Sequence, residues 1–96
     1  MSLHRRGDAF YVRIGHEELM STRRHDSETA LAELACRPVA DRDAPVVLIG
    51  GLGLGFSAAA ALEVLPATAT VEVAEVFPQI VQWNRDHTEG FGKPLT

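Results

Sequence analysis

The sequence predicts an α/β fold, and three observations in its second half support this prediction. The apolar stretch 46–49 (Val-Val-Leu-Ile) leads directly into a glycine-rich run, residues 50–55. A helix-prone stretch, residues 56–65, comes next, and a β-branched stretch, residues 70–76, follows it. Strand, glycine turn, helix and strand in this order predict a parallel β-α-β unit.

The N-terminal part, residues 1–25, is predicted to be a β-hairpin region. Residues 10–14 (Phe-Tyr-Val-Arg-Ile) are aromatic and β-branched, which favours a strand. Gly15-His16 is a plausible turn, and residues 17–22 can return as the second strand.

A first helix is predicted to follow this region. Asp26 or Ser27 is a suitable N-cap, and Leu31, Leu34 and Ala35 share one face at helical spacing. We expect the helix to end before Pro38, because the residue ahead of a proline disfavours the helical conformation.

Residues 26–96 are predicted to be the first half of a larger parallel domain. The small-residue run 57–61 should let the second helix pack close to the sheet, and Pro66 should end that helix. Pro78 suits the first turn of a last helix that runs to about His87, with apolar positions at Ile80, Val81 and Trp83. Residues 88–96 are expected to form a loop.

Two parallel strands make a poor sheet by themselves. We therefore expect either a fragment of a larger protein or a chain that completes its sheet with a partner. Open edges on both strands favour self-association into a homo-oligomer.

Composition excludes several classes of function. Seven arginines are matched by eight acids through residue 45, and the net charge is −4, so no basic stripe favours a nucleic-acid partner. No apolar run approaches the ~20 residues that span a bilayer. The single cysteine, Cys36, suits a reducing cytoplasm. The four histidines have no ligand spacing, so no metal site is predicted.

The glycine run and one acid predict a site for a small molecule. Glycine lets the chain turn sharply and lie against a ligand. Glu75 ends the second strand, 20 positions after Gly55, where an acid accepts hydrogen bonds from ribose hydroxyls in doubly wound folds. Glu72 is the competing acid, but it lies within the strand. The alternative is a turn without ligand and a solvated strand end.

A dinucleotide fits this turn poorly. Its fingerprint is Gly-x-Gly-x-x-Gly directly after the strand. Counted from Gly50, the second glycine position is Leu52; counted from Gly51, the third is Phe56. An NAD(P)-dependent oxidoreductase is therefore the third-ranked function.

The spacing Gly51-x-Gly53-x-Gly55 resembles the first motif of class I S-adenosylmethionine-dependent methyltransferases. Residues 47–55, the run Glu75-Val76-Phe77-Pro78 and the segment 26–39 resemble the spermidine synthase-like branch of these proteins. The resemblance implies a partial Rossmann-like fold that binds S-adenosylmethionine or its decarboxylated form. It also implies the cofactor-binding residues, which are Gly50, Gly51, Leu52, Gly53, Gly55, Glu75 and Val76.

Three departures from that branch favour a methyltransferase-like protein over an aminopropyltransferase. Gly53 stands where polyamine synthases have aspartate, Ala30-Leu31-Ala32 replaces Tyr-His-Glu, and Ser21 replaces a glutamine. The family's catalytic aspartate follows a fourth strand beyond this sequence, so no catalytic base is assigned. The expected activity is group transfer by the complete protein. A non-catalytic α/β binding or interaction module is the alternative.

Overall fold

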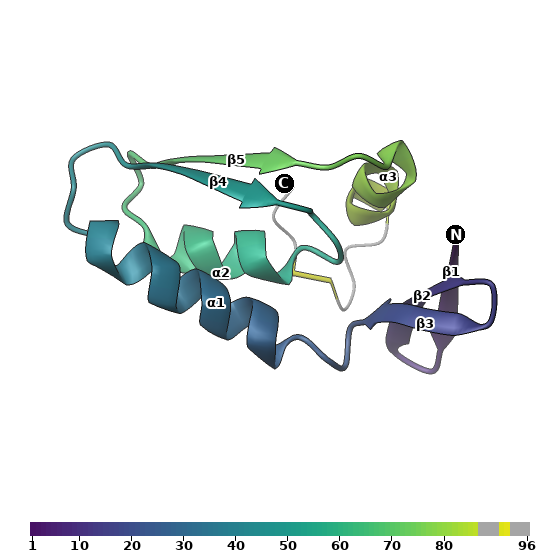
Figure 1. Ribbon diagram of the computed structural model, residues 1–96. Helices are drawn as coiled ribbons and strands as arrows, with labels where there is room; N and C mark the ends of the chain where they lie inside the picture. Colours follow the sequence, from purple (N-terminus) through teal and green to yellow (C-terminus); the bar gives the residue numbers. More distant parts are fainter. Residues whose placement is uncertain (87–90, 93–96) are drawn as a thin grey trace.

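A computed structural model of the protein describes residues 1–86 and 91–92. Its fold is mixed α/β, with an antiparallel sheet followed by a parallel strand pair and its helices (Figure 1). The elements in chain order are β1 (Ser2–Arg6), β2 (Ala9–Ile14), β3 (Glu17–Ser21), α1 (Asp26–Cys36), a short 3₁₀ helix (Arg37–Val39), β4 (Val46–Gly50), α2 (Phe56–Val64), β5 (Thr70–Ala74) and α3 (Pro78–Asp86).

The N-terminal region is a three-stranded antiparallel sheet in the order β1-β2-β3. The predicted hairpin corresponds to β2 and β3, whereas β1 was not predicted. Its sequence, Ser-Leu-His-Arg-Arg, contains no β-branched residue. Ring contacts across the strands hold it: His4 stacks on its partner Tyr11 at 5.1 Å between centroids, and the Arg6 guanidinium lies 5.3 Å from the Tyr11 ring.

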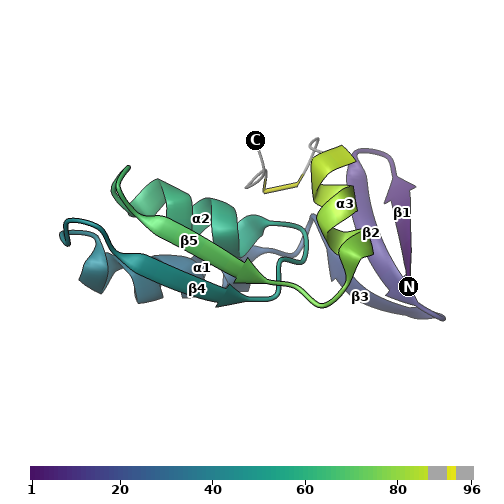
Figure 2. The ribbon, with the colours of Figure 1, turned by 90° about the horizontal axis from the view of Figure 1, so that it is seen from above.

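The predicted β-α-β unit is present as the parallel pair β4 and β5, joined through α2. Val47 and Ile49 pair with Val71 and Val73 and point toward the helices. Figures 1 and 2 show α1 and α2 on one face of this pair, with no described element over the other. Val46 and Leu48, on that open face, are 68% and 69% exposed.

The prediction that Leu31, Leu34 and Ala35 form the buried face of α1 is wrong. Leu31 and Leu34 are 66% and 69% exposed, and Ala35 is also exposed. The helix packs through Ala32 and Cys36 instead, against a cluster that also contains Ala60, Ala61 and Leu65. Small residues on both helices let α1 and α2 approach closely. This close packing selects the face with Ala32 and Cys36 for burial, in place of the face with the larger leucines.

The predicted N-cap of this helix is also wrong. The helix begins at Asp26, and His25 occupies the cap position without a side-chain cap bond. The His25 ring stacks on Phe56 at 4.1 Å, with the ring planes 12° apart. Packing against the start of α2 therefore fixes this end of α1 in place of capping.

The proline boundaries agree with prediction. The first helix ends at Cys36 and the second at Val64, ahead of Pro38 and Pro66, and Pro78 begins α3. His87, the predicted end of α3, lies outside the described residues, as does most of the loop expected at 88–96.

The described residues form two apolar clusters, and one of them includes the glycine turn. One cluster lies between α1, α2 and the parallel strands, and its alanines confirm the predicted close packing of α2 on the sheet. The other contains Phe10, Val12 and Leu54, with Trp83 packed against it. Since Leu54 belongs to the glycine run, the turn is held between the N-terminal sheet and α3.

Candidate functional site

The glycine turn follows the carboxyl end of β4 and requires glycine at three positions. Gly51, Gly53 and Gly55 have φ values of +92°, +54° and +87°, which L side chains rarely adopt. The Gly51 N–H donates to the carbonyl of Ala74 at the end of β5, at 2.7 Å. The turn therefore begins beside the end of the neighbouring strand.

Glu75 lies on this turn, directly after β5. Its Oε1 accepts hydrogen bonds from the backbone N–H of Leu52 at 2.8 Å and of Gly53 at 3.4 Å. Its Oε2 accepts from the N–H of Phe77 at 3.1 Å. The carboxylate thus joins the glycine turn to the segment after β5.

These bonds favour the ionised form of Glu75. Burial alone would raise the pKa, but hydrogen bonds from the backbone of Phe77, Leu52, Gly53 and Val76 outweigh it and hold the pKa of this carboxyl below its ordinary value of 4.5. At neutral pH the site therefore carries a negative charge. Glu72, the competing acid, is exposed on the open face of the sheet opposite Leu48.

Asn84 holds the other side of the turn, and the sequence analysis missed it. This fully buried side chain on α3 donates from Nδ2 to the Gly53 carbonyl at 2.7 Å and to the Ile80 carbonyl at 2.8 Å. A polar residue four positions after Ile80, on the apolar face of a helix, is the signal that could have identified it.

The residues predicted to bind a ligand fall into two groups. Gly50 and Gly51 are exposed, and a Cβ added at either would meet no atom within 4 Å, so open space adjoins this part of the backbone. Val76 is 85% exposed beside Glu75. By contrast, Leu52 is buried, and Gly55 is buried at the N-cap position of α2.

A cavity of about 410 Å³ opens against the glycine run. Its other walls come from the end of β3, from the first turn of α1 and the segment before it, and from the start of α2. This volume lies within the range of small-molecule sites, about 300–1,000 Å³. The cavity is lined by Met20, Arg24, Glu28, Gly51, Gly53 and Phe56, among others.

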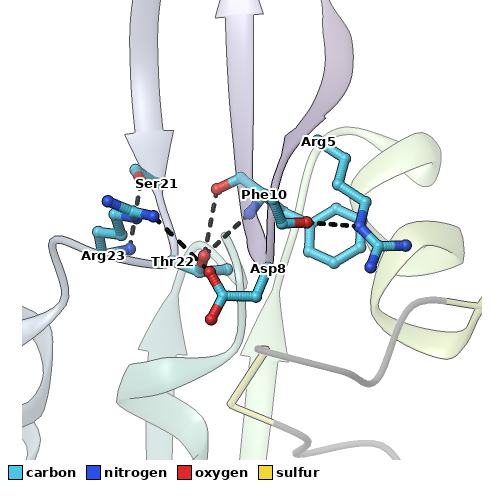
Figure 3. Close-up of polar contacts among 7 residues, drawn as sticks. Arg5, Asp8, Phe10, Ser21, Thr22 and Arg23 are labelled. Atoms are coloured by element: carbon cyan, nitrogen blue, oxygen red, sulfur yellow. Dashed lines mark hydrogen bonds and ion pairs between the residues drawn. The ribbon is translucent and has the colours of Figure 1, made fainter.

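The segment that leads from β3 toward this cavity is fixed to the N-terminal sheet (Figure 3). The Thr22 hydroxyl accepts from the Phe10 N–H at 3.0 Å and donates to the Phe10 carbonyl at 3.3 Å. Arg23 pairs with Asp8 at 3.6 Å, and neither residue lines the cavity. The N-terminal sheet therefore positions one wall of the cavity.

Within residues 1–86 and 91–92, no three His, Cys, Asp or Glu side chains lie close enough together to hold a metal ion. None of the helices in the same residues is both long enough and apolar enough to cross a membrane.

Comparison with protein-family models, with curated proteins and with solved structures finds no significant match.

Proposed function

We propose that the glycine turn binds the adenosyl group of S-adenosylmethionine or its decarboxylated form. The chain would be the cofactor-binding part of a cytoplasmic, methyltransferase-like protein of the spermidine synthase-like group, with a Rossmann-like fold. The observation that supports this most strongly is the Glu75 carboxylate, which lies on the turn with Oε1 2.8 Å from the Leu52 nitrogen.

Glu75 would accept the ribose hydroxyls. A carboxylate offers about four lone-pair positions, and its hydrogen bond from the Gly53 N–H is long at 3.4 Å. A ribose hydroxyl can therefore replace that bond at little cost, while the shorter bond from Leu52 keeps the carboxylate in place. Val76 and Phe77 are 85% and 47% exposed. They offer an apolar surface for the adenine next to the ribose position.

The charge of the site favours a sulfonium over a diphosphate. An ionised Glu75 attracts the positively charged sulfur. It repels the diphosphate of NAD(P), whose phosphates need the same backbone amides that Leu52 and Gly53 donate to the carboxylate. The dinucleotide-dependent oxidoreductase is accordingly the weaker candidate.

Calorimetric titration of the full chain with S-adenosylmethionine, its decarboxylated form and NAD tests the proposal. We expect one or both sulfonium ligands to bind and NAD not to bind. Glu75→Gln should weaken sulfonium binding at least tenfold, because a charge-assisted hydrogen bond contributes about 1.5–3 kcal/mol. Glu72→Gln is the matched control, since that acid is exposed on the open sheet face, and it should bind like the wild type.

Binding of NAD without either sulfonium would contradict the proposal. A folded chain that binds none of these ligands would favour the non-catalytic interaction module.

A further inference from the structure

The hydrogen bonds around Gly53 form a closed ring that joins the glycine turn to α3. The Gly53 N–H donates to the Glu75 carboxylate, and the Gly53 carbonyl accepts from the Asn84 side chain. The backbone closes the ring, because Glu75 also accepts from the Phe77 N–H at 3.1 Å and α3, which carries Asn84, follows directly. Two side chains therefore hold Gly53, one through its N–H and the other through its carbonyl.

The two restraints on Gly53 are unequal. This residue has a φ of +54°, and a glycine changes its backbone conformation at little cost because it has no Cβ. Its bond to Glu75 is long, with 3.4 Å between the nitrogen and Oε1, whereas the Asn84 Nδ2 lies 2.7 Å from the carbonyl oxygen. The stronger restraint on the conformation of Gly53 therefore comes from Asn84.

Packing alone does not explain an asparagine at position 84. The side chain is fully buried, and its Nδ2 donates to the carbonyls of Gly53 and Ile80. Among the described residues, no donor reaches its Oδ1. An unpaired buried carbonyl oxygen is unfavourable, and a leucine of similar volume would fill the position without it. What a leucine cannot supply is the hydrogen bond to the Gly53 carbonyl.

We propose that Asn84 is a positioning residue for Glu75, because it holds Gly53 in the conformation in which the Gly53 N–H faces the carboxylate. In the ligand-bound state this inference rests on the proposed function. When a ribose hydroxyl replaces the 3.4 Å bond from Gly53, Glu75 no longer restrains that residue. The bond from Asn84 then keeps Gly53, and with it this part of the turn, in place beside the ligand.

An NMR titration of the wild-type full chain tests this role without any substitution. As the pH falls from neutral and Glu75 takes up a proton, the Gly53 amide resonance should shift. The side-chain NH₂ resonances of Asn84 should shift with the same midpoint, since the two groups are joined through Gly53. Asn84 resonances that stay constant while the Gly53 amide shifts would overturn the inference.

The substitution Asn84→Leu removes the donor and keeps a similar side-chain volume. Because Gly53 is then less restrained, the pKa of the Glu75 carboxyl should rise toward its ordinary value of 4.5. The second readout is the affinity of 5′-methylthioadenosine, which has both ribose hydroxyls, against that of its 2′,3′-dideoxy analogue. Asn84→Leu should prefer the hydroxylated ligand only about threefold, and the wild type about tenfold.

The matched control is Gln82→Leu on the same helix, where the exposed side chain contacts only Asp86. It should leave the pKa of Glu75 and the ligand preference unchanged. A folded Asn84→Leu variant that melts at a lower temperature but keeps the wild-type pKa and preference would overturn the inference. If Asn84→Leu does not fold, the wild-type titration decides. Failure of 5′-methylthioadenosine to bind the folded wild type would overturn the proposed function, whereas the pKa comparison would still decide the role of Asn84.

Discussion

Glu75 makes stability depend on pH in a defined direction. Its pKa is lower in the folded chain than the ordinary value of 4.5, so the folded state prefers the ionised carboxyl. This contribution to the free energy of unfolding is fully present above about pH 4.5, the ordinary pKa. It is lost as the pH falls through the lower pKa of the folded state. Thermal melts between pH 7 and pH 3 should show a drop in Tm that is smaller for Glu75→Gln; equal drops in both proteins would contradict this role.

Substitutions at two adjacent glycines, Gly50 and Gly51, test the cost of a positive φ without side-chain crowding. A Cβ meets no atom within 4 Å at either Gly50 or Gly51, but only Gly51 has a positive φ, +92°. We expect Gly51→Ala to lower the free energy of unfolding by about 1–2 kcal/mol, and Gly50→Ala by less than about 0.5 kcal/mol. Denaturant titration measures both. Equal losses would show that φ at Gly51 does not constrain the turn.

The site could be predicted from the sequence only in part, and Glu75 and Asn84 show the difference. Glu75 was singled out because it ends the second predicted strand, 20 positions after Gly55, where doubly wound folds have an acid, and its carboxylate does contact the turn. Asn84 was missed because its role depends on how α3 packs against the turn. Local sequence does not specify that packing angle.

At the scale of elements, Asn84 of α3 hydrogen-bonds the backbone of the glycine turn. Asn84→Ala removes the hydrogen bonds to the Gly53 and Ile80 carbonyls and leaves a space in a fully buried position. The free energy of unfolding should fall by roughly 2–4 kcal/mol. Gln82→Ala on the same helix is the control, since it removes only an exposed contact with Asp86. A loss no larger than that of the control would contradict the anchoring role.

Local pattern predicted the strands β2, β3, β4 and β5 and the proline-bounded helix ends, because residue type and chain stiffness decide these features. It failed for β1 and for the buried face of α1. In β1, ring contacts with Tyr11 replace β-propensity. In α1, the alanines of α2 select Ala32 and Cys36 over the leucines. Both depend on partners distant in sequence.

At the scale of the molecule, the open face of the parallel pair predicts self-association. Val46 and Leu48 are 68% and 69% exposed there, and each strand of the described pair has one neighbour only. Light scattering at increasing concentration should show a mass above that of the monomer. Leu48→Lys should lower the measured mass, because it places a charge on the open face, beside the paired residue Glu72. Leu19→Lys, on the exposed side of β3, is the control. A clean monomer at high concentration would contradict the prediction.

The most direct test of the central claim asks whether Glu75 recognises ribose hydroxyls. The affinity of 5′-methylthioadenosine and of its 2′,3′-dideoxy analogue would be measured for the wild-type chain and for Glu75→Gln. We predict that the wild type prefers the hydroxylated ligand about tenfold and that Glu75→Gln shows almost no preference. The same preference in both proteins, or no binding of the hydroxylated ligand to the folded wild type, would contradict the assignment of Glu75 as the ribose acceptor.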